Sequence, residues 1–322
     1  MSSLNVLVIA DPSAAFLKPL STLPKEVNVT IADKLDDLKK VAPHTDVIMF
    51  AHGKPELLTE ILPLASRTKW IHSLWTGVEG IVTPQIAKHS APLTNGRGVF
   101  QWPLADWVVA SMLFFAFKFR DVLTQQEQGI WKMVHGRMLE GQTLGIVGYG
   151  SIGRAAAERA KAFRMKIAAL RRKSALLQSE PLVDVGYAQD QLRELMAASD
   201  YILVSTPLTA ETRGLIGVSE IVAMKPSAVI INVGRGPVIN EAAMIHALQS
   251  GAIRGAALDV FDVEPLPSDH PFWKMPNVLL SPHTADRVEG FLTPALDCFL
   301  DNLSRFRSGT SLRNIVEKTA GY

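Results

Sequence analysis

Three residues in the last third of the chain have side chains that could act together on a carbonyl group. Arg235 stands between two glycines after an apolar run, Glu264 follows a second apolar run, and His283 follows a third. A protonated histidine can donate a proton to a carbonyl oxygen, a carboxylate can stabilise the imidazolium, and a guanidinium can bind a substrate carboxylate. Because ligands of open α/β sheets bind beyond the carboxyl ends of the strands, we expect these side chains to converge.

Each of the three residues also has a structural interpretation when it is taken alone. Arg235 could cap a loop, Glu264 could lie in solvent, and His283 could be a hydrogen-bonded core histidine. Their combination with a cofactor motif earlier in the chain favours the catalytic interpretation, with hydride transfer to a carbonyl as the chemistry.

That cofactor motif is the segment LGIVGYGSIGR at residues 144–154. Gly148, Gly150 and Gly153 follow an apolar run and open an alanine-rich helical pattern, which is the context that a dinucleotide-binding turn requires. The glycines allow a tight turn and a close approach of the backbone to a pyrophosphate, which the helix N-terminus attracts. We assign the intervening Ser151 and Ile152 to the same site. A glycine turn of an ordinary α/β protein is the alternative.

Two arginines stand where the choice between NAD and NADP is usually made. Arg171 and Arg172 follow the apolar run at 166–170, where a site for NAD would carry an acidic residue to bind the adenosine ribose hydroxyls. Guanidinium groups can hold a 2′-phosphate instead, with charge assistance. The preferred cofactor is therefore expected to be NADPH, with NAD still possible. Two solvated surface cations are the alternative interpretation.

Short apolar runs alternate with helical patterns along the chain, which is typical of parallel α/β sheets. In the first hundred residues the predicted strands are 5–10, 27–32, 46–51 and 70–75. From residue 143 onward the predicted strands are 144–148, 166–170, 201–205, 229–233, 256–260 and 278–281. A long buried helix is expected from Leu104 to about Ile130. A second helix is expected at 241–250, because Asn240 can cap its start and Gly251 can end it.

The C-terminal segment is expected to form an amphipathic helix that packs back onto one of the domains. Its apolar residues at helical spacing are Leu292, Leu296, Phe299, Leu300 and Leu303. Cys298 lies among them, and we interpret it as a packing residue with no reactive role.

Length and composition point to a two-domain globular protein. The chain has 322 residues, 48% of them apolar and 20% charged, and a length above 300 favours two domains. The net charge of +2 gives no sign of a nucleic-acid partner. With Cys298 as the only cysteine, an intrachain disulfide and a cysteine-based metal site are excluded. The apolar run at 108–117 is too short for a membrane span, so we expect a cytoplasmic protein.

Several longer motifs are similar to those of the D-isomer-specific 2-hydroxyacid dehydrogenases. They are GYGSIGR, SDYILVSTPLTAETRGLI, MKPSAVIINVGRGPVINE, GAALDVFDVEPLP and PNVLLSPHTA. The resemblance runs from about Leu74 to the C-terminus. It implies two Rossmann-like, doubly wound parallel-sheet domains, with a nucleotide domain at 104–287 inserted into a flavodoxin-like substrate domain made of 1–103 and 288–322.

The resemblance also implies roles for individual residues. Arg235 would anchor the substrate, His283 would be the acid/base, and Glu264 would be the partner of the histidine. Asp259 would face the nicotinamide amide. The remaining implied contacts are with the cofactor for Thr206, Pro207 and Val233, and with the substrate carboxylate for Gly77 and Val78 of the segment TGVEG. A plain turn is the alternative for that segment.

Some positions depart from the family pattern. Arg164 replaces the glycine that commonly ends the nucleotide-domain helix, so we expect a local adjustment there. Asp286 stands where a small neutral residue is more usual, and it would raise the pKa of His283 if it came close. Asp106 and Trp107 replace a common Glu-His pair. We expect this replacement to affect details of the hinge between the domains and not the chemistry.

The resemblance and the expected use of NADPH predict a reductase of small 2-keto acids that gives the D-hydroxy acid where the product is chiral. Glyoxylate and hydroxypyruvate are the leading substrates by this resemblance. The alternatives are a dehydrogenase of a larger keto acid and a dinucleotide-sensing scaffold like the transcriptional corepressors of the same fold. A homodimer is expected, because the apolar helix from Leu104 carries more apolar surface than one domain needs. Trp131 would then reach a neighbouring subunit or pack in the core.

Overall fold

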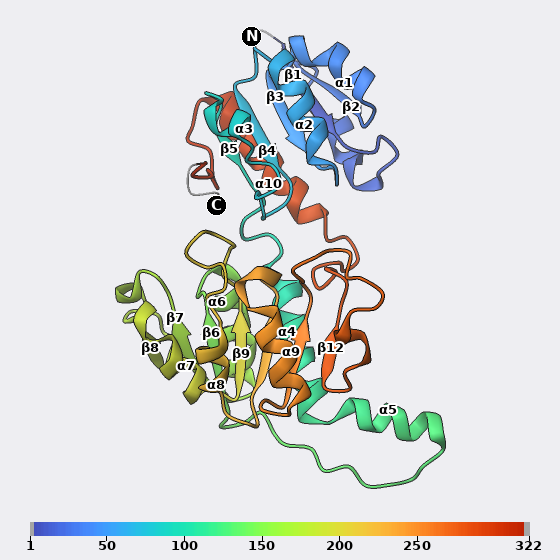
Figure 1. Cartoon of the computed structure of the whole chain (residues 1–322). Helices are drawn as coiled ribbons and strands as arrows, with labels where there is room; N and C mark the ends of the chain where they lie inside the picture. Colours follow the sequence, from blue (N-terminus) through green and yellow to red (C-terminus); the bar gives the residue numbers. More distant parts are fainter. Residues whose placement is uncertain (1–2, 319–322) are drawn as a thin grey trace. The chain divides into compact units, whose positions relative to one another are not determined.

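The computed structural model describes residues 3–318, and these form two compact α/β units (Figure 1). The described part of the first unit lies within Met1–Phe100 and Glu289–Tyr322, and the second unit is Gln101–Val288. The boundaries expected from the sequence, at 104 and 287, lie within a few residues of these. Both units are built on parallel sheets with helices, so the predicted fold class is confirmed.

The first unit contains a five-stranded parallel sheet with the strand order β2-β1-β3-β4-β5, which is the flavodoxin-like order. Its strands are β1 (Leu4–Ile9), β2 (Val27–Ala32), β3 (Val47–Phe50), β4 (Trp70–Ser73) and β5 (Leu93–Thr94). The four predicted strands are present. The sequence pattern missed β5, because a strand of two residues is too short to produce a recognisable apolar run.

Helices from both ends of the chain pack on this sheet. They are η1 (Ala15–Thr22), α1 (Leu35–Val41), η2 (Ala42–His44), α2 (Pro55–Ile61), η3 (Leu62–Leu64), α3 (Pro84–Lys88) and α10 (Thr293–Ser308). Helix α10 is the predicted C-terminal helix. Its residues Leu296, Phe299 and Leu303 are buried, and the Phe299 ring stacks on Trp70 of β4 with 5.3 Å between centroids. The expectation that this segment packs back onto a domain is confirmed.

Cys298 on α10 has the environment of a packing residue. Its Sγ lies 3.7 Å from Nδ2 of Asn314 and 3.9 Å from the carbonyl oxygen of Asn95. Burial raises the pKa of the Cys298 thiol, so the reactive thiolate is disfavoured.

A buried histidine lies under the same helix. His72 of β4 is fully buried beside Trp70 and Phe299, and its Nδ1 lies 2.7 Å from Oγ1 of Thr94. That hydroxyl also accepts a hydrogen bond from Trp70 Nε1 at 2.8 Å. Burial lowers the pKa of His72 to about 3, because the apolar surroundings disfavour the charged imidazolium.

This buried histidine should make the first unit sensitive to acid. The unfolded chain takes up a proton near the ordinary histidine pKa of about 6.5, whereas folded His72 stays neutral down to about pH 3. Stability should therefore fall by about 1.4 kcal/mol per pH unit below 6.5 from this group alone. The replacement His72→Leu should remove this contribution to the pH dependence of the unfolding free energy. Urea unfolding of both proteins at pH 7 and pH 5 measures it, and equal slopes would contradict the prediction.

The second unit contains a seven-stranded parallel sheet with the order β12-β11-β10-β9-β6-β7-β8. Its strands are β6 (Thr143–Val147), β7 (Lys166–Leu170), β8 (Val185–Tyr187), β9 (Tyr201–Val204), β10 (Val229–Asn232), β11 (Gly255–Leu258) and β12 (Val278–Leu280). Six of the seven strands are those predicted. Strand β8 was missed because it lies at the sheet edge and is mostly exposed, so its residues do not form an apolar run.

The helices of the second unit connect these strands. They are α4 (Gln101–Ala116), α5 (Phe119–Gln128), α6 (Ser151–Ala162), η4 (Ser174–Leu177), η5 (Gln189–Gln191), α7 (Leu192–Ala198), α8 (Val218–Val222), η6 (Gly236–Val238), α9 (Glu241–Gln249) and η7 (Pro271–Lys274). The predicted start of α9 is confirmed, since Oδ1 of Asn240 accepts a hydrogen bond from the amide of Ala243 at 2.9 Å. Gly251 takes a positive φ of 69° just beyond the helix.

The prediction of one buried helix from Leu104 to about Ile130 is wrong. Lys118 takes a left-handed conformation with a φ of 53° and separates α4 from α5, which are bent by 63°. Helix α4 packs against α6 and is largely buried, but α5 has no buried residue and projects from the second unit (Figure 1). Within residues 3–318, no single helix is long and apolar enough to cross a membrane.

Arg164 shows how the chain manages without a glycine after α6. Arg164 itself takes a left-handed conformation with a φ of 56°, and its amide donates to the carbonyl of Lys161 at 2.9 Å. The helix therefore ends in the geometry that glycine would adopt, at a cost of roughly 1 kcal/mol for a residue with a Cβ atom. The side chain is exposed and pairs with Glu140 at 3.0 Å.

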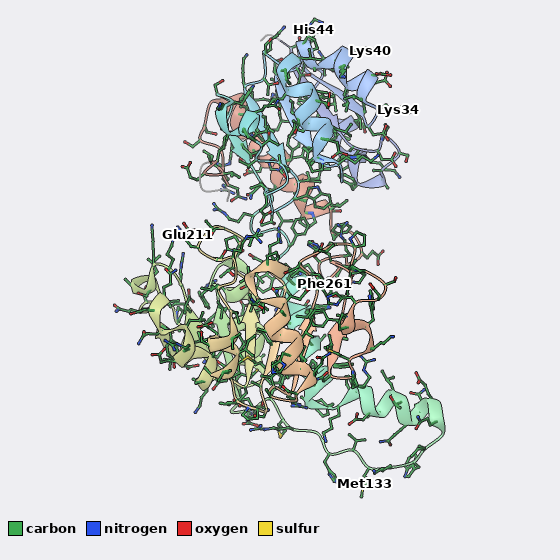
Figure 2. All side chains as sticks on the ribbon, in the orientation of Figure 1. Lys34, Lys40, His44, Met133, Glu211 and Phe261 are labelled. Carbon is green, nitrogen blue, oxygen red and sulfur yellow. The ribbon has the colours of Figure 1, made fainter. Side chains whose placement is uncertain are left out.

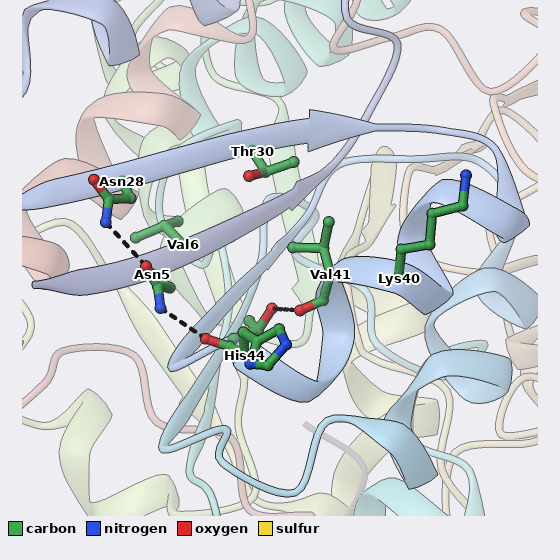
Figure 3. A pocket seen from close by; sticks show the side chains of 8 residues that line it. Asn5, Val6, Asn28, Thr30, Lys40, Val41 and His44 are labelled. Atoms are coloured by element: carbon green, nitrogen blue, oxygen red, sulfur yellow. Dashed lines mark hydrogen bonds between the residues drawn. The ribbon is translucent and has the colours of Figure 1, made fainter.

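A hollow of about 240 Å³ lies in the first unit at the amino ends of its first strands (Figure 3). Asn5 donates to the carbonyl of His44, and Asn28 donates to Oδ1 of Asn5. The hollow is thus at the edge of the sheet opposite to the one where α/β proteins place their ligands.

Candidate active site

The structure brings two of the three candidate catalytic residues into contact. Nδ1 of His283 lies 2.7 Å from Oε2 of Glu264. Glu264 follows β11 and His283 follows β12, and these strands are neighbours in the sheet. Oε1 of Glu264 accepts a hydrogen bond from the amide of Phe261 at 2.9 Å, which fixes the orientation of the carboxylate. Both side chains remain partly exposed, so a ligand can reach them.

The electrostatics of the pair favour a charged histidine. The hydrogen bond to Glu264 and the charge of that carboxylate raise the pKa of His283, against the opposing effects of burial and of Arg235. Burial alone would raise the pKa of Glu264, but the contacts with His283 and the Phe261 amide, together with the charge of Arg235, lower it below its ordinary value. The pair therefore favours the protonated form of the imidazole.

Asp259 anchors the loop that carries His283. Its Oδ1 accepts hydrogen bonds from the amides of Thr284 and Ala285 at 2.8 and 3.0 Å and from Oγ of Ser281 at 2.6 Å. The amide of His283 donates to the Asp259 carbonyl. These bonds hold His283 in a left-handed conformation with a φ of 52°, a strained geometry that is common at functional sites. Sequence reasoning missed this anchoring, because its three donors lie more than twenty residues away.

Arg235 lies in the loop after β10, within electrostatic reach of both His283 and Glu264. Its side chain is partly buried, and its Nη1 donates to the carbonyl of Gly234 at 2.7 Å. The next residue, Gly236, packs directly on the peptide that joins Phe261 to Asp262, where a Cβ atom would overlap the Phe261 carbonyl. The loops that carry Arg235 and Glu264 are therefore pressed against one another, and only glycine fits between them.

The glycine motif forms the expected strand–turn–helix. Gly148, at the end of β6, takes a φ of 96°, and α6 begins at Ser151 with Gly150 as its N-cap. A Cβ atom on Gly153 would come within 2.8 Å of Ile146 Cγ2, whereas one on Gly150 would meet nothing within 4 Å. The third glycine thus allows close helix–strand packing and the second leaves the backbone open toward a ligand, which fits a dinucleotide pyrophosphate.

The other predicted cofactor residues follow strands β9 and β10 of the same sheet. Thr206 packs against Gly148, and within residues 3–318 its Oγ1 is one of the buried side-chain atoms without a hydrogen-bond partner. Pro207 follows it after β9. Val233, after β10, is buried and donates its amide to Val204 at 3.1 Å. The buried Thr206 hydroxyl without a partner and the open backbone at Gly150 fit a bound dinucleotide.

Arg171 and Arg172 are exposed just after β7, at the edge where the second sheet would receive the adenosine end of a dinucleotide. The structure also places an acid near the turn that the sequence did not indicate. Glu180 pairs with Arg154 at 3.4 Å and lies close enough to Tyr149 to influence its pKa. It was missed because it stands well beyond the end of the strand.

Gly77 and Val78 follow β4 in the first unit, in an ordered turn. The carbonyl of Thr76 accepts a hydrogen bond from Asn95 Nδ2 at 2.7 Å, and the Val78 carbonyl accepts from Ile81 and Val82. The turn thus lies at the carboxyl edge of its sheet. The role of its amides toward a substrate carboxylate stays a prediction.

The residues that depart from the family pattern have local partners. Oδ1 of Asp286 lies 3.5 Å from Nε of Arg287, and the groups that shift the pKa of His283 are Glu264, Arg235 and Asp259. Asp286 is therefore not the partner of the histidine. Asp106 pairs with Arg159 at 2.8 Å. Trp131 is fully exposed, so the alternative that it packs in the core is wrong.

Comparison with known proteins gives a consistent result along most of the chain. Residues 109–285 match the model of the family described as D-isomer specific 2-hydroxyacid dehydrogenase, NAD binding domain. The glyoxylate reductase of Thermococcus litoralis is 35% identical over 268 residues, which cover 80% of this chain and 80% of the relative.

Two solved structures cover nearly the whole chain. A D-isomer specific 2-hydroxyacid dehydrogenase family protein from Aeromonas salmonicida superposes with a TM-score of 0.87 at 30% identity, covering 98% of this chain and 100% of the other. The NADPH-dependent glyoxylate/hydroxypyruvate reductase of Sinorhizobium meliloti, solved with NADP and sulfate, superposes with a TM-score of 0.84 at 25% identity and covers both chains completely.

Proposed function

The chain belongs to the D-isomer-specific 2-hydroxyacid dehydrogenase family, whose members are NAD(P)-dependent oxidoreductases, and on this basis we propose that it reduces glyoxylate and hydroxypyruvate with NADPH. The observation that carries the proposal is the 2.7 Å contact between His283 and Glu264, with Arg235 close to both. The names of the relatives from Thermococcus litoralis and Sinorhizobium meliloti support the substrate class.

Each of the three side chains has one role in this reaction. The guanidinium of Arg235 binds the carboxylate of the keto acid and orients its carbonyl. His283 donates a proton from its imidazolium to the carbonyl oxygen, and Glu264 stabilises the imidazolium beforehand. A bound nicotinamide supplies the hydride.

The preference for NADPH rests on Arg171 and Arg172, which offer two guanidinium groups to a 2′-phosphate. The Sinorhizobium meliloti reductase is named as NADPH-dependent, which supports the same choice. Glu180 is an acceptor for the ribose hydroxyls of NADH. The ratio of kcat/KM with NADPH to kcat/KM with NADH therefore decides which dinucleotide is preferred.

A panel of 2-keto acids tested with NADPH and with NADH examines the proposal. We expect turnover of glyoxylate and hydroxypyruvate with NADPH, with a higher kcat/KM than with NADH. A higher kcat/KM for a branched or aromatic keto acid would identify a dehydrogenase of larger substrates. Binding of NADPH without turnover of any keto acid would point to a dinucleotide-sensing protein.

We further propose that the protein is a homodimer that buries the projecting segment around α5. This segment exposes apolar side chains on α5 and in the extended stretch after it, which reaches Met133 (Figure 2). They are Phe119, Val122, Leu123, Ile130, Trp131, Met133 and Met138. Exposed apolar surface of this extent is typical of a subunit interface.

Light scattering at micromolar concentration should therefore report twice the chain mass. The double variant Leu123→Glu and Trp131→Glu should be a monomer, because two carboxylates would be buried without partners in the interface. Val222→Glu is a matched control, since Val222 is 77% exposed on α8, away from this segment. A monomeric wild-type protein would refute the proposal.

A further inference from the structure

The loop that carries Glu264 has no helix or strand over residues 259–270. Besides the Phe261 amide that orients the carboxylate, packing and hydrogen bonds at the two ends of the loop must hold it in position. The upstream end is held by Phe261, which is buried and packs against Phe272 and Gly236. Glu264 itself lies in the middle of the loop, where most residues are exposed. The downstream end therefore needs an anchor of its own.

His270 provides contacts at that downstream end. Its Nε2 lies 3.1 Å from Oε1 of Glu241, and its Nδ1 accepts a hydrogen bond from the amide of Phe272 at 3.3 Å. The imidazole also packs on the Phe272 ring, with 4.7 Å between centroids. The two side chains are largely buried, with 13% of His270 and 25% of Glu241 exposed.

These contacts define one tautomer of the imidazole. Because Nδ1 accepts from a backbone amide, it carries no proton, and the proton of the neutral ring lies on Nε2. Nε2 then donates to Glu241. One neutral histidine thus caps η7 and reaches the first residue of α9 at the same time. The other charged group beside this contact is Asp262, which is itself influenced by Arg213.

We propose that the His270–Glu241 contact is a positioning pair that fixes Glu264 relative to Arg235 and thereby keeps Glu264 against His283. Glu241 begins α9 shortly after the loop that carries Arg235, and His270 ends the loop that carries Glu264. The contact therefore joins the two loops a second time, beyond the packing of Gly236 on Phe261. The proposal rests on the proposed roles of Glu264 and His283.

Three variants separate this positioning role from a general effect on folding. His270→Asn keeps an acceptor for the Phe272 amide, and asparagine is a favoured cap, but its side chain is too short to reach Glu241. Glu241→Ala removes the acceptor from the other side. Glu241→Gln keeps an acceptor oxygen for the Nε2 proton and is the matched control.

The pKa of His283 is the readout, because the groups that face it are Glu264, Arg235 and Asp259 and only the first would move. It is followed by NMR titration of the imidazole protons in the protein without substrate, and the signal is assigned by its loss in His283→Gln. The variant Glu264→Gln gives the largest shift to expect. The high-pH limb of kcat/KM for glyoxylate reduction is the second readout.

We expect His270→Asn and Glu241→Ala to lower the pKa of His283 by about half a unit, less than Glu264→Gln does, and Glu241→Gln to match the wild type. An unchanged pKa in both disrupting variants would overturn the proposal, and so would a Glu241→Gln variant that behaves like Glu241→Ala. If one disrupting variant does not fold, the other still decides. A wild-type protein without turnover would count against the proposed function, while the titration would still test the pair.

Discussion

Replacing His283 with alanine should lower the rate of glyoxylate reduction by about 10²–10⁴-fold, the usual contribution of a general acid. His283 is the imidazole that Glu264 holds at 2.7 Å, and Asp259 fixes the loop around it. The affinity for NADPH should change little, because the glycine turn and the arginines lie on other loops. Steady-state rates at pH 7 and a fluorescence titration with NADPH measure the two quantities. A variant that kept its rate would exclude His283 as the proton donor.

The pH dependence of the wild-type reaction should report the protonation of His283. Reduction requires the imidazolium, and the pKa of His283 is raised above its ordinary value by Glu264. The rate of reduction should therefore persist through neutral pH and fall as the pH rises through this elevated pKa. Oxidation of the hydroxy acid requires the neutral imidazole, so its rate should rise over the same pH range.

The variant Glu264→Gln tests the source of the raised pKa. Glutamine can keep a hydrogen bond to His283 but removes the negative charge, so the high-pH limb of reduction should move to lower pH. Profiles of kcat/KM for the wild type and the variant give the comparison. If the limb did not move, the carboxylate would not be the group that holds the proton on His283.

Replacing both Arg171 and Arg172 with glutamine should weaken NADPH far more than NADH. The loss of one charge-assisted hydrogen bond costs about 1.5–3 kcal/mol, which corresponds to roughly ten- to a hundredfold in the dissociation constant. NADH lacks the 2′-phosphate, so its affinity should change little. Calorimetric titrations with both dinucleotides provide the measurement.

A second double variant controls for the change in net charge. Lys25→Gln and Lys34→Gln remove two exposed cations from the first unit and should leave both affinities as they are. Equal weakening of NADPH and NADH by the arginine variant would indicate a general electrostatic effect. Unchanged affinity for NADPH would show that the arginines are only surface charges, and Glu180 would then become the candidate contact for the ribose.

Much of the fold and of the site is determined by local sequence. The strands that are covered on both faces of a parallel sheet are nearly continuous apolar runs, such as those at 201–205 and 229–233, and these are visible without any knowledge of their neighbours. The glycine turn and the cap of α9 at Asn240 depend on residues within one or two helical turns. The longer motifs that contain Arg235, Glu264 and His283 were enough to indicate the family and the convergence of the three side chains.

Other features arise only when distant segments meet, so no local pattern could indicate them. The break at Lys118 separates α4, which packs on α6, from α5, which has no buried residue and projects outward. Strands β5 and β8 are defined by pairing with β4 and β7, because their own residues are too few or too exposed. The anchoring of the His283 loop by Asp259 and the contact between His270 and Glu241 each join residues more than twenty positions apart. Hydrogen bonds of this kind depend on distances in space, which the tertiary structure sets.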